Sequence, residues 1–553
     1  MEEKFMKNKT VLSGVIAPAK LVCAKGMNKT SEFRFSAKAG SVSFRLFKFA
    51  CLFLLLFAWA EASAQNTTAS ISGSVKDSEG EPLQSAAILV TNNETGAFYG
   101  TVTNRFGIFS VSGLKPGNYL VKISFLGYQE VAYDNVILSL GKDYNFNVVL
   151  KEDNVNLPTV TIRGESTYFN ETRTGQIYNV NRESMALLPS VNRSMLDYTR
   201  LSPYSGIENT MAGRDGRVTT LTIDGAVMNN SFGLSADLPG AGTPISIDAV
   251  EEMQIAIAPY DVRQSNFTGG GINVITKSGT NTFKGTAYTY FHNEKLRGNK
   301  IDGVDLGNRV SSSHTTVGFT LGGPILKDKL FYFVNAEYVT TPGPITEYKL
   351  SQNGVGDAAA KISRVTAADM ELFAAALKAY GYDAGSYDLS NGDQTNTKML
   401  ARIDWNINNN NNLMLRYNWT GNKQWFTPSG KSTVGAKSAN DRISQSGYAF
   451  RNNCYTQNDN AWSAVAELNS RLSGHMSNKF SASVSDVSNL RGSESAWFPH
   501  IDIRKDGDAF MSAGYEAFTN GTGNYVRTYN ISDHIRWTLS HSIITAGLSY
   551  QYQ

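Results

Sequence analysis

The sequence predicts a mainly β protein made of a signal peptide, a β-sandwich domain, an α+β plug domain and an incomplete antiparallel transmembrane β-barrel. Three observations support this prediction. Glycine is abundant and proline scarce, with 49 and 14 residues respectively, and only 18% of the residues are charged. Almost every segment in the second half alternates polar and apolar residues. The connections between those segments also alternate between long and short.

The N-terminal region has the three parts of a secretory signal peptide. Arg45 and Lys48 supply the basic part, and the apolar run at 46–60 follows them. That run is too short to span a bilayer comfortably. Ala62-Ser63-Ala64 provides a small-residue cleavage site, so we expect cleavage between Ala64 and Gln65.

Cleavage changes the charge of the protein. The chain has 51 basic and 48 acidic residues, of which residues 1–64 hold 10 and 4, so the exported part keeps 41 and 44. The excess of basic residues therefore belongs to the leader, and nothing indicates nucleic-acid binding. One cysteine, Cys454, remains after cleavage, which excludes a disulfide framework and a cysteine-based zinc site. The leader is long enough that Met27 is a candidate start.

Residues 65–152 are predicted to form a β-sandwich, because short strands and turns follow one another closely. The predicted strands are 70–75, 86–91, 101–102, 108–111, 117–125, 131–138 and 144–150. Three stretches, G-S-V-K-D-S-E-G-E-P-L-Q-S-A, T-N-R-F-G-I-F-S-V-S-G-L-K-P-G-N-Y and I-S-F-L-G-Y, resemble the carboxypeptidase regulatory-like domain family. That resemblance implies an accessory domain without catalytic residues.

Residues 153–165 are predicted to be a linker with a Pro-containing extended segment. It is either a plain linker, a last strand of the sandwich, or a peptide that adds as a strand to a partner's sheet. Its position resembles that of the TonB box of TonB-dependent receptors, although Pro158-Thr159 replaces the usual acidic residue. The candidate TonB-contact residues are Leu157, Pro158, Thr159, Val160, Thr161 and Ile162.

Residues 166–280 mix predicted helices at 184–188 and 194–200 with strands at 219–223, 250–257 and 272–276. The stretches I-S-I-D-A-V-E-E-M-Q-I and A-P-Y-D-V-R-Q-S-N-F-T-G-G-G-I-N-V-I-T-K-S-G-T-N resemble the plug domain of TonB-dependent outer-membrane receptors of the Oar-like type. Two loops are candidates for facing a ligand, although loops of this kind are more often solvated or paired with a barrel wall. Their candidate residues are Arg214, Asp215, Arg217, Asn229 and Asn230.

Residues 281–553 are predicted to be the N-terminal part of a barrel. In 398–407, Met399, Ile403 and Trp405 share one face, whereas Lys398 and Arg402 lie on the other. Such strands, apolar on one face and charged on the other, are typical of outer-membrane barrels. Nine are predicted: 283–291, 314–322, 329–339, 397–407, 412–420, 460–470, 477–487, 529–539 and 543–553.

The spacing of these strands separates a barrel from a soluble sandwich. The connections are 22, 6, 57, 4, 39, 6, 41 and 3 residues long, as expected for short periplasmic turns and long external loops. Trp405 and Trp537 fall near the periplasmic ends, and Trp419 and Trp462 near the external ends, as two aromatic girdles would. A plugged lumen needs about 22 strands, so we expect this sequence to be the N-terminal portion of a longer receptor.

The resemblance implies an outer-membrane transporter that takes up an external ligand. The partners implied are TonB with ExbB and ExbD, outer-membrane lipid, and a ligand that the sequence does not identify, with a surface lipoprotein as a further partner. The alternative is a surface-binding or export-assisting protein with little import. No histidine lies in an H-E-x-x-H motif and G-G-P-I-L-K-D-K lacks the end of a phosphate loop, so neither an enzyme nor a cofactor is expected.

Overall fold

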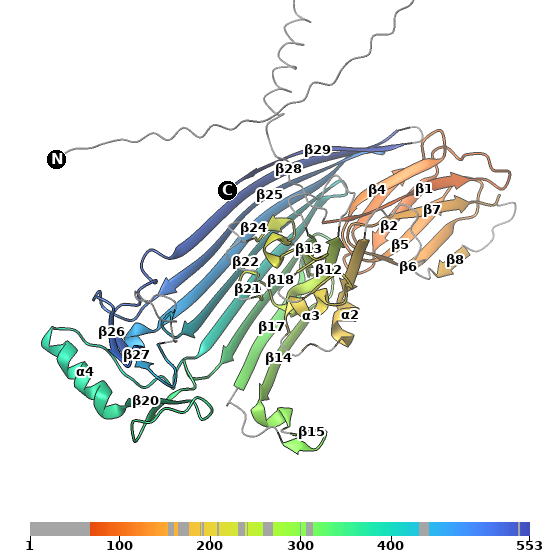
Figure 1. Cartoon of the computed structure of the whole chain (residues 1–553). Coiled ribbons are helices and arrows are strands. Elements are labelled where there is room, and N and C mark those ends of the chain that lie inside the picture. The colour runs from red at the N-terminus through yellow and green to blue at the C-terminus, as the bar shows by residue number, and fades with distance from the viewer. Residues whose placement is uncertain are drawn as a thin grey trace, which may run out of the picture. The chain divides into compact units, whose positions relative to one another are not determined.

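The computed structural model describes residues 67–152, 160–163, 176–188, 190, 193–206, 210–229, 238–240, 242–257, 269–298, 300–305, 313–430, 442–539 and 542–553. The predicted cleavage site at Ala64 and Gln65, Leu157–Thr159 of the TonB-box-like segment, and Asn230 lie outside these residues. Within them the protein is mainly β, as predicted (Figure 1). No helix among the described residues is long and apolar enough to cross a membrane.

The first domain is a sandwich of two sheets, which confirms the predicted strands. One sheet has the order β4-β1-β7, with β1 and β7 parallel, and the other has the order β3-β2-β5-β6-β8. Apolar residues of both sheets, including Ile71, Val90 and Val121, form a fully buried core between them. The strands are β1 (Ala69–Lys76), β2 (Ala87–Asn92), β3 (Phe98–Val102), β4 (Ile108–Leu114), β5 (Gly117–Ser124), β6 (Val131–Leu138), β7 (Asp143–Val149) and β8 (Val160–Arg163).

Strand β8 contains part of the TonB-box-like segment. It pairs in parallel with β6, from Val131 with Val160 to Asp134 with Arg163. The sequence left open whether this segment is a plain linker, a last strand of the sandwich or a partner-binding peptide. In the structure, these four residues form a last strand of the sandwich. A role in binding a partner stays a prediction.

The plug is built on a five-stranded sheet with the order β11-β10-β13-β12-β9. Its fully buried core includes Leu221, Ile223 and Ile272. Asn181 and Ser194 cap the two short helices through their side chains, as polar residues before a helix commonly do. The sequence patterns missed β9 and β11. The elements are β9 (Gln176–Asn181), α2 (Arg182–Leu187), α3 (Met195–Thr199), η2 (Gly216–Val218), β10 (Thr220–Ile223), β11 (Ala226–Val227), η3 (Ile247–Ala249), β12 (Val250–Ile257) and β13 (Gly271–Thr276).

All nine predicted barrel strands are present and form one antiparallel sheet in which each strand pairs with the next (Figure 1). The sheet is open, with β14 and β29 at its edges. Long connections at 294–312, 342–393, 427–454 and 493–522 alternate with short ones, which confirms the predicted pattern. The strands are β14 (Lys284–Asn293), β17 (Ser313–Leu326), β18 (Leu330–Thr341), β21 (Gln394–Asn408), β22 (Asn411–Phe426), β24 (Tyr455–Ser473), β25 (Met476–Gly492), β28 (Gly523–Thr538) and β29 (Ile543–Tyr552).

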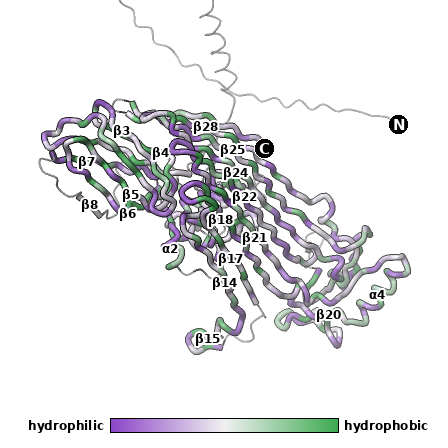
Figure 2. Tube along the Cα trace, turned by 180° about the vertical axis from the view of Figure 1, so that it is seen from behind, coloured by the Kyte–Doolittle hydropathy of each residue, from purple (hydrophilic) through white to green (hydrophobic). Residues whose placement is uncertain are grey.

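Burial on the two faces of this sheet is the opposite of that in a soluble protein: the apolar side chains are exposed and the charged side chains are buried. In β21, Met399 and Trp405 are 51% and 45% exposed, whereas Lys398 and Arg402 are 5% and 4% exposed. Hydropathy alternates along the same strands in Figure 2. Because charges face the plug and apolar side chains face outward, the sheet has the polarity expected of a wall that stands in lipid.

The long connections contain structure that the sequence patterns missed. Parts of three of them share one buried core, which includes Val365, Phe373, Phe450 and Cys454. Helix α4 begins with a capping box in which Thr366 and Asp369 satisfy each other's backbone donors. We call this unit the external module. Its elements are β19 (Lys349–Ser351), β20 (Ile362–Thr366), α4 (Ala367–Ala379), β23 (Tyr448–Ala449), η5 (Arg451–Asn453), β26 (Ile501–Lys505) and β27 (Asp508–Ala513).

The described residues of the connection after β14 form small elements. The short helix η4 (Glu294–Arg297) follows β14 directly, with Asn293 as its cap. Strands β15 (Lys300–Ile301) and β16 (Val304–Asp305) then form a small two-stranded sheet.

Candidate functional site: the plug and its attachment to the barrel wall

The tight turn between β10 and β11 places a carboxylate at the centre of the contact between plug and wall. Asp224 and Gly225 both have positive φ angles, 47° and 82°, as a hairpin turn of this kind requires. Asp224 is 1% exposed. Its two carboxylate oxygens accept hydrogen bonds from the backbone and the hydroxyl of Thr276, at 3.0 and 2.8 Å. The turn therefore holds a fully buried acid in a fixed orientation.

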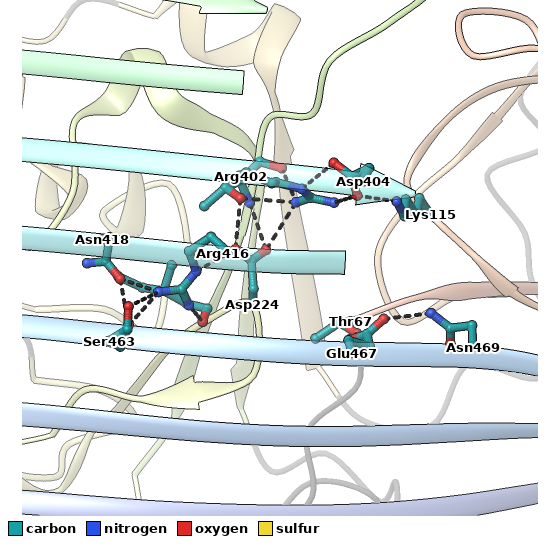
Figure 3. A network of polar contacts seen from close by, with 12 residues as sticks. Thr67, Lys115, Asp224, Arg402, Asp404, Arg416, Asn418, Ser463, Glu467 and Asn469 are labelled. Carbon is teal, nitrogen blue, oxygen red and sulfur yellow. Dashed lines mark hydrogen bonds and ion pairs between the residues drawn. The ribbon is translucent and has the colours of Figure 1, made fainter. Parts of the chain in front are cut away.

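Two arginines of the barrel wall face this acid (Figure 3). Nε of Arg416 lies 3.1 Å from one carboxylate oxygen of Asp224, and a guanidinium nitrogen of Arg402 lies 3.5 Å from the other. Arg416 also donates to the carbonyl of Ile223, and Arg402 donates to the carbonyl of Thr276 at 2.8 Å. Because burial of an unpaired charge is costly, each of these three charged groups depends on the others.

The same network continues into the sandwich. Arg402 donates two hydrogen bonds to Asp404, at 2.8 and 3.0 Å. Asp404 also accepts from the ammonium group of Lys115, which lies in the turn between β4 and β5 (Figure 3). A continuous chain of charged contacts therefore connects the sandwich, the wall and the plug.

A second polar contact holds the plug to neighbouring strands of the wall. The Ser246 hydroxyl donates to Glu337 at 2.8 Å, and Glu337 also accepts from Lys398 at 2.7 Å and from Tyr288 at 2.9 Å. Arg193 of the plug pairs with Asp248 and lies over the Tyr290 ring, 4.1 Å from its centroid. Strands β14, β18 and β21 are thereby attached to the plug at one level.

The turn that follows β13 passes very close to the wall. A Cβ atom at Gly279 would lie 2.3 Å from the carbonyl oxygen of Tyr332 and 2.8 Å from that of Gly323. Such a contact is too short for any side chain, so glycine is needed here for close approach rather than for its φ angle.

The plug also contacts the sandwich through Glu252 of β12. Its carboxylate accepts from the backbone of Leu140 at 2.9 Å and from the amide of Asn179 at 2.6 Å. Burial raises the pKa of Glu252 to about 7, because the ionised carboxylate loses its hydration. This group consequently titrates near neutral pH.

The predicted ligand-facing residues have different surroundings. Arg214, Asp215 and Arg217 are exposed, and Asp215 both caps η2 and pairs with Arg217 at 2.6 Å. Hydrogen bonds from Arg217 lower the pKa of Asp215 to about 2. The amide of Asn229 is used within the plug, where it accepts from the backbone of Leu221 at 2.7 Å. Contact of these residues with a ligand stays a prediction.

A cavity of about 630 Å³ lies between the plug and the external half of the wall. The plug turn Leu238–Gly240 forms one side of it. Side chains of β22, β24 and β25 form the other, among them Phe426, Gln457, Asp459 and Arg491. The lining is partly polar and partly apolar and carries both signs of charge.

The residues that attach the plug were not predicted as a site. Lys398, Arg402 and Asp404 were assigned to the polar face of a strand, and Asp224 to a loop. The available signal was the presence of charged residues on the face of a barrel strand that points away from lipid. Which charges meet depends on the fold, because Asp224 and Arg416 are far apart in sequence.

Two family models match the chain. Residues 70–151 match the carboxypeptidase regulatory-like domain. Residues 275–351 match the outer membrane beta barrel domain.

Two curated proteins match about half of the chain or slightly less. The TonB-dependent transporter Oar of Myxococcus xanthus is 27% identical over 289 residues, which cover 49% of this chain and 26% of Oar. The TonB-dependent receptor SusC of Bacteroides thetaiotaomicron is 28% identical over 256 residues, which cover 42% of this chain and 24% of SusC. The chain thus spans about a quarter of the length of the curated relatives it matches.

Solved structures also resemble this chain. The siderophore receptor PirA of Acinetobacter baumannii has 17% identity and a TM-score of 0.43, with 69% of this chain and 48% of PirA covered. The outer membrane transporter YddB of Escherichia coli has 10% identity and a TM-score of 0.47, with 68% and 47% covered. The sequence matches make this chain a homologue of the TonB-dependent outer-membrane receptors, located in the outer membrane of a Gram-negative cell, with a carboxypeptidase regulatory-like domain before its barrel.

Proposed function

We propose that this chain is part of a TonB-dependent receptor that takes up an external ligand through a plugged barrel. The observation that carries the proposal is the attachment of the plug to the inner wall, with Asp224 buried between Arg402 and Arg416. A ligand passes only if these contacts are broken or rearranged. Passage therefore requires work on the plug.

The energy for this work is proposed to arrive mechanically. The outer membrane has no nucleotide supply, and the family uses TonB with ExbB and ExbD in the inner membrane. We assign the TonB contact to Leu157–Ile162, of which Val160–Ile162 form most of β8. An extended segment of this kind binds by adding as a strand to a partner's sheet. A pull on it reaches the plug through residues 164–175, which join β8 to β9.

The ligand is proposed to enter the external cavity between the plug turn Leu238–Gly240 and the wall. The external module is built from the long connections. The cavity lies at the strand ends that these connections join, so the cavity and the module are on the same side of the barrel. Arg214, Asp215, Arg217, Asn229 and Asn230 remain candidate contacts on the plug.

The test is deletion of Leu157–Ile162 from the full-length receptor. We expect uptake to fall to the level of a strain without the receptor, while ligand binding at the cell surface stays within about twofold of wild type. The matched control is Glu183→Gln, a change at an exposed position of the plug helix α2, which should leave uptake unchanged. Retained uptake after the deletion contradicts the coupling role.

A surface-binding protein with little import is the second candidate function. It is favoured by the external module, which has its own core and presents Trp497 at 73% exposure beside Tyr515. Exposed aromatic side chains are frequent at binding surfaces. Binding without any uptake by the wild-type receptor would support this candidate over transport.

A further inference from the structure

The strand that carries the proposed TonB contact is held by the receptor's own sandwich. Strand β8 pairs with β6 through four residues, Val160–Arg163, and is the last strand of its sheet. Its backbone is therefore engaged on one side. A partner that binds by strand addition also forms hydrogen bonds with the backbone N–H and C=O groups of the strand.

Strand β6 has a bulge at Asp134 and Asn135, where its register with β5 shifts, and Asn135 has a φ angle of 58°. The last described pair of β8, Arg163 with Asp134, already lies in this bulge. A bulge disrupts the hydrogen-bond ladder locally, so the attachment of β8 is weakened at this end.

The sandwich is itself bonded to the barrel wall. Arg536 of β28 pairs with Asp143 at 2.7 Å, and the Thr101 hydroxyl donates to the carbonyl of Gly474 at 2.7 Å. Lys115 pairs with Asp404, and Lys284 of β14 pairs with Glu94 at 2.9 Å. While β8 stays on β6, a pull on β8 is therefore carried by the sandwich and the wall. The plug receives the pull only after β8 leaves β6.

We propose that the sandwich is a latch on the coupling strand, and that transfer of Val160–Arg163 from β6 to TonB is the step that engages the plug. This inference rests on the proposed coupling role of the segment. It assigns the regulatory-like domain a mechanical role: it keeps the coupling strand disengaged until TonB competes for it.

The test is a disulfide that fixes β8 to β6 in the full-length receptor. Asp134→Cys with Arg163→Cys joins the register partners at one end of the pairing, and Val131→Cys with Val160→Cys joins those at the other. Cys454 is the one cysteine among the described residues and is buried, so it does not compete. The matched control is Thr91→Cys with Phe98→Cys, which joins β2 to β3 at the opposite edge of the sheet.

The probe is the purified periplasmic domain of TonB, added to the detergent-solubilised receptor. We expect each β6–β8 disulfide to weaken TonB binding at least tenfold, and a reductant to restore it. The control disulfide should change binding less than twofold. Unchanged binding by an oxidised β6–β8 receptor overturns the proposal, and so does failure of both β6–β8 pairs to form under an oxidant that forms the control.

The outcomes also separate this inference from the proposed function. A reduced receptor that does not bind the TonB domain contradicts the coupling role of the segment. A reduced receptor that binds TonB, and an oxidised one that binds equally well, contradicts only the latch.

Discussion

The sandwich and the barrel wall are both built from strands that alternate polar and apolar residues, yet they bury opposite faces. In the sandwich, Val90 and Val121 are fully buried between two sheets. In the wall, Leu415 is 42% exposed and its neighbour Arg416 is 3% exposed. The alternation of residues is the same, so the surroundings decide which face is covered. Water surrounds the sandwich, whereas lipid covers one face of the wall and the plug covers the other.

This difference explains why buried charged and polar groups occur where the plug meets the wall. A soluble core is held by apolar burial. The apolar core of the plug continues into the wall through Phe333, Leu400 and Ala461. Charged and hydroxyl groups such as Asp224, Arg416 and Glu337 add polar contacts at the same border. Paired charges of this kind fix a unique arrangement and leave a border that water can enter when the pairs separate.

The largest expected effect is the loss of stability of the sandwich when a charge is placed in its core. Val121→Asp places an unpaired carboxylate in a fully buried apolar core. We expect a loss of about 5 kcal/mol, which is close to the whole stability of a small domain. Hydrogen exchange of β1, β2 and β5 in the full-length protein measures it. Lys122→Thr, one residue along and on the other face, is the control and should change exchange little.

The next effect removes the acid that joins the plug to the wall. Asp224→Ala leaves the buried guanidinium groups of Arg402 and Arg416 without their common partner. We expect the plug to be destabilised by about 4 kcal/mol. Hydrogen exchange of β10 and β13 should rise accordingly, while Glu183→Gln at an exposed position of helix α2 should leave it unchanged. Equal protection in both variants would show that the buried contact does not hold the plug.

A charge introduced on the outward face of the barrel wall tests whether that face contacts lipid. Leu415 points outward, between the levels of the two tryptophan girdles. Leu415→Lys should cost about 3 kcal/mol in the folded receptor in lipid bilayers, whereas Leu415→Ile should cost less than about 1 kcal/mol. Urea unfolding in vesicles measures both. A tolerated lysine would show that this face does not contact hydrocarbon.

The last effect, no larger than the previous one, is the pH dependence of the contact between plug and sandwich. The pKa of Glu252 is raised to about 7, above its ordinary value of 4.5. The folded state thus binds a proton that the unfolded state has lost, so the stabilising effect of that proton is complete below about pH 4.5. It declines as pH rises towards 7 and is lost above it, by up to about 3 kcal/mol.

Thermal unfolding of the receptor between pH 5 and pH 8 measures this dependence. Glu252→Gln, which carries no titrating proton, should flatten the profile. An unchanged profile in this variant would assign the pH dependence to another group.

Much of the fold could be predicted because local patterns control it. The nine barrel strands follow from period-2 alternation, and the sandwich strands follow from turns such as Lys115–Asn118. Strand β9 was missed because its sequence, Q-I-Y-N-V-N, alternates only weakly and gains its place by pairing with β12. The external module was missed because its core combines Val365, Cys454 and Phe510 from three different connections.

The candidate site was only partly predictable for a similar reason. The charged faces of β21 and β22 were visible in the sequence as side chains that avoid lipid. Their partners were not, because the Asp224–Arg416 pair joins residues in different domains. For Asn229, the sequence suggested a ligand-facing residue of a plug loop, whereas the structure shows its side-chain amide oxygen accepting from the backbone of Leu221. Pairing across domains is set by topology, which residue spacing does not report.

The shared core of the external module has an evolutionary consequence. Loops usually tolerate insertions and exchange between relatives because few contacts depend on them. Here one connection cannot be replaced alone, since its residues complete a core that the other two also build. Variation in what the cell surface presents is therefore confined to outward side chains such as Leu372, Tyr380 and Trp497, and should accumulate there while Phe373 and Phe450 stay constant.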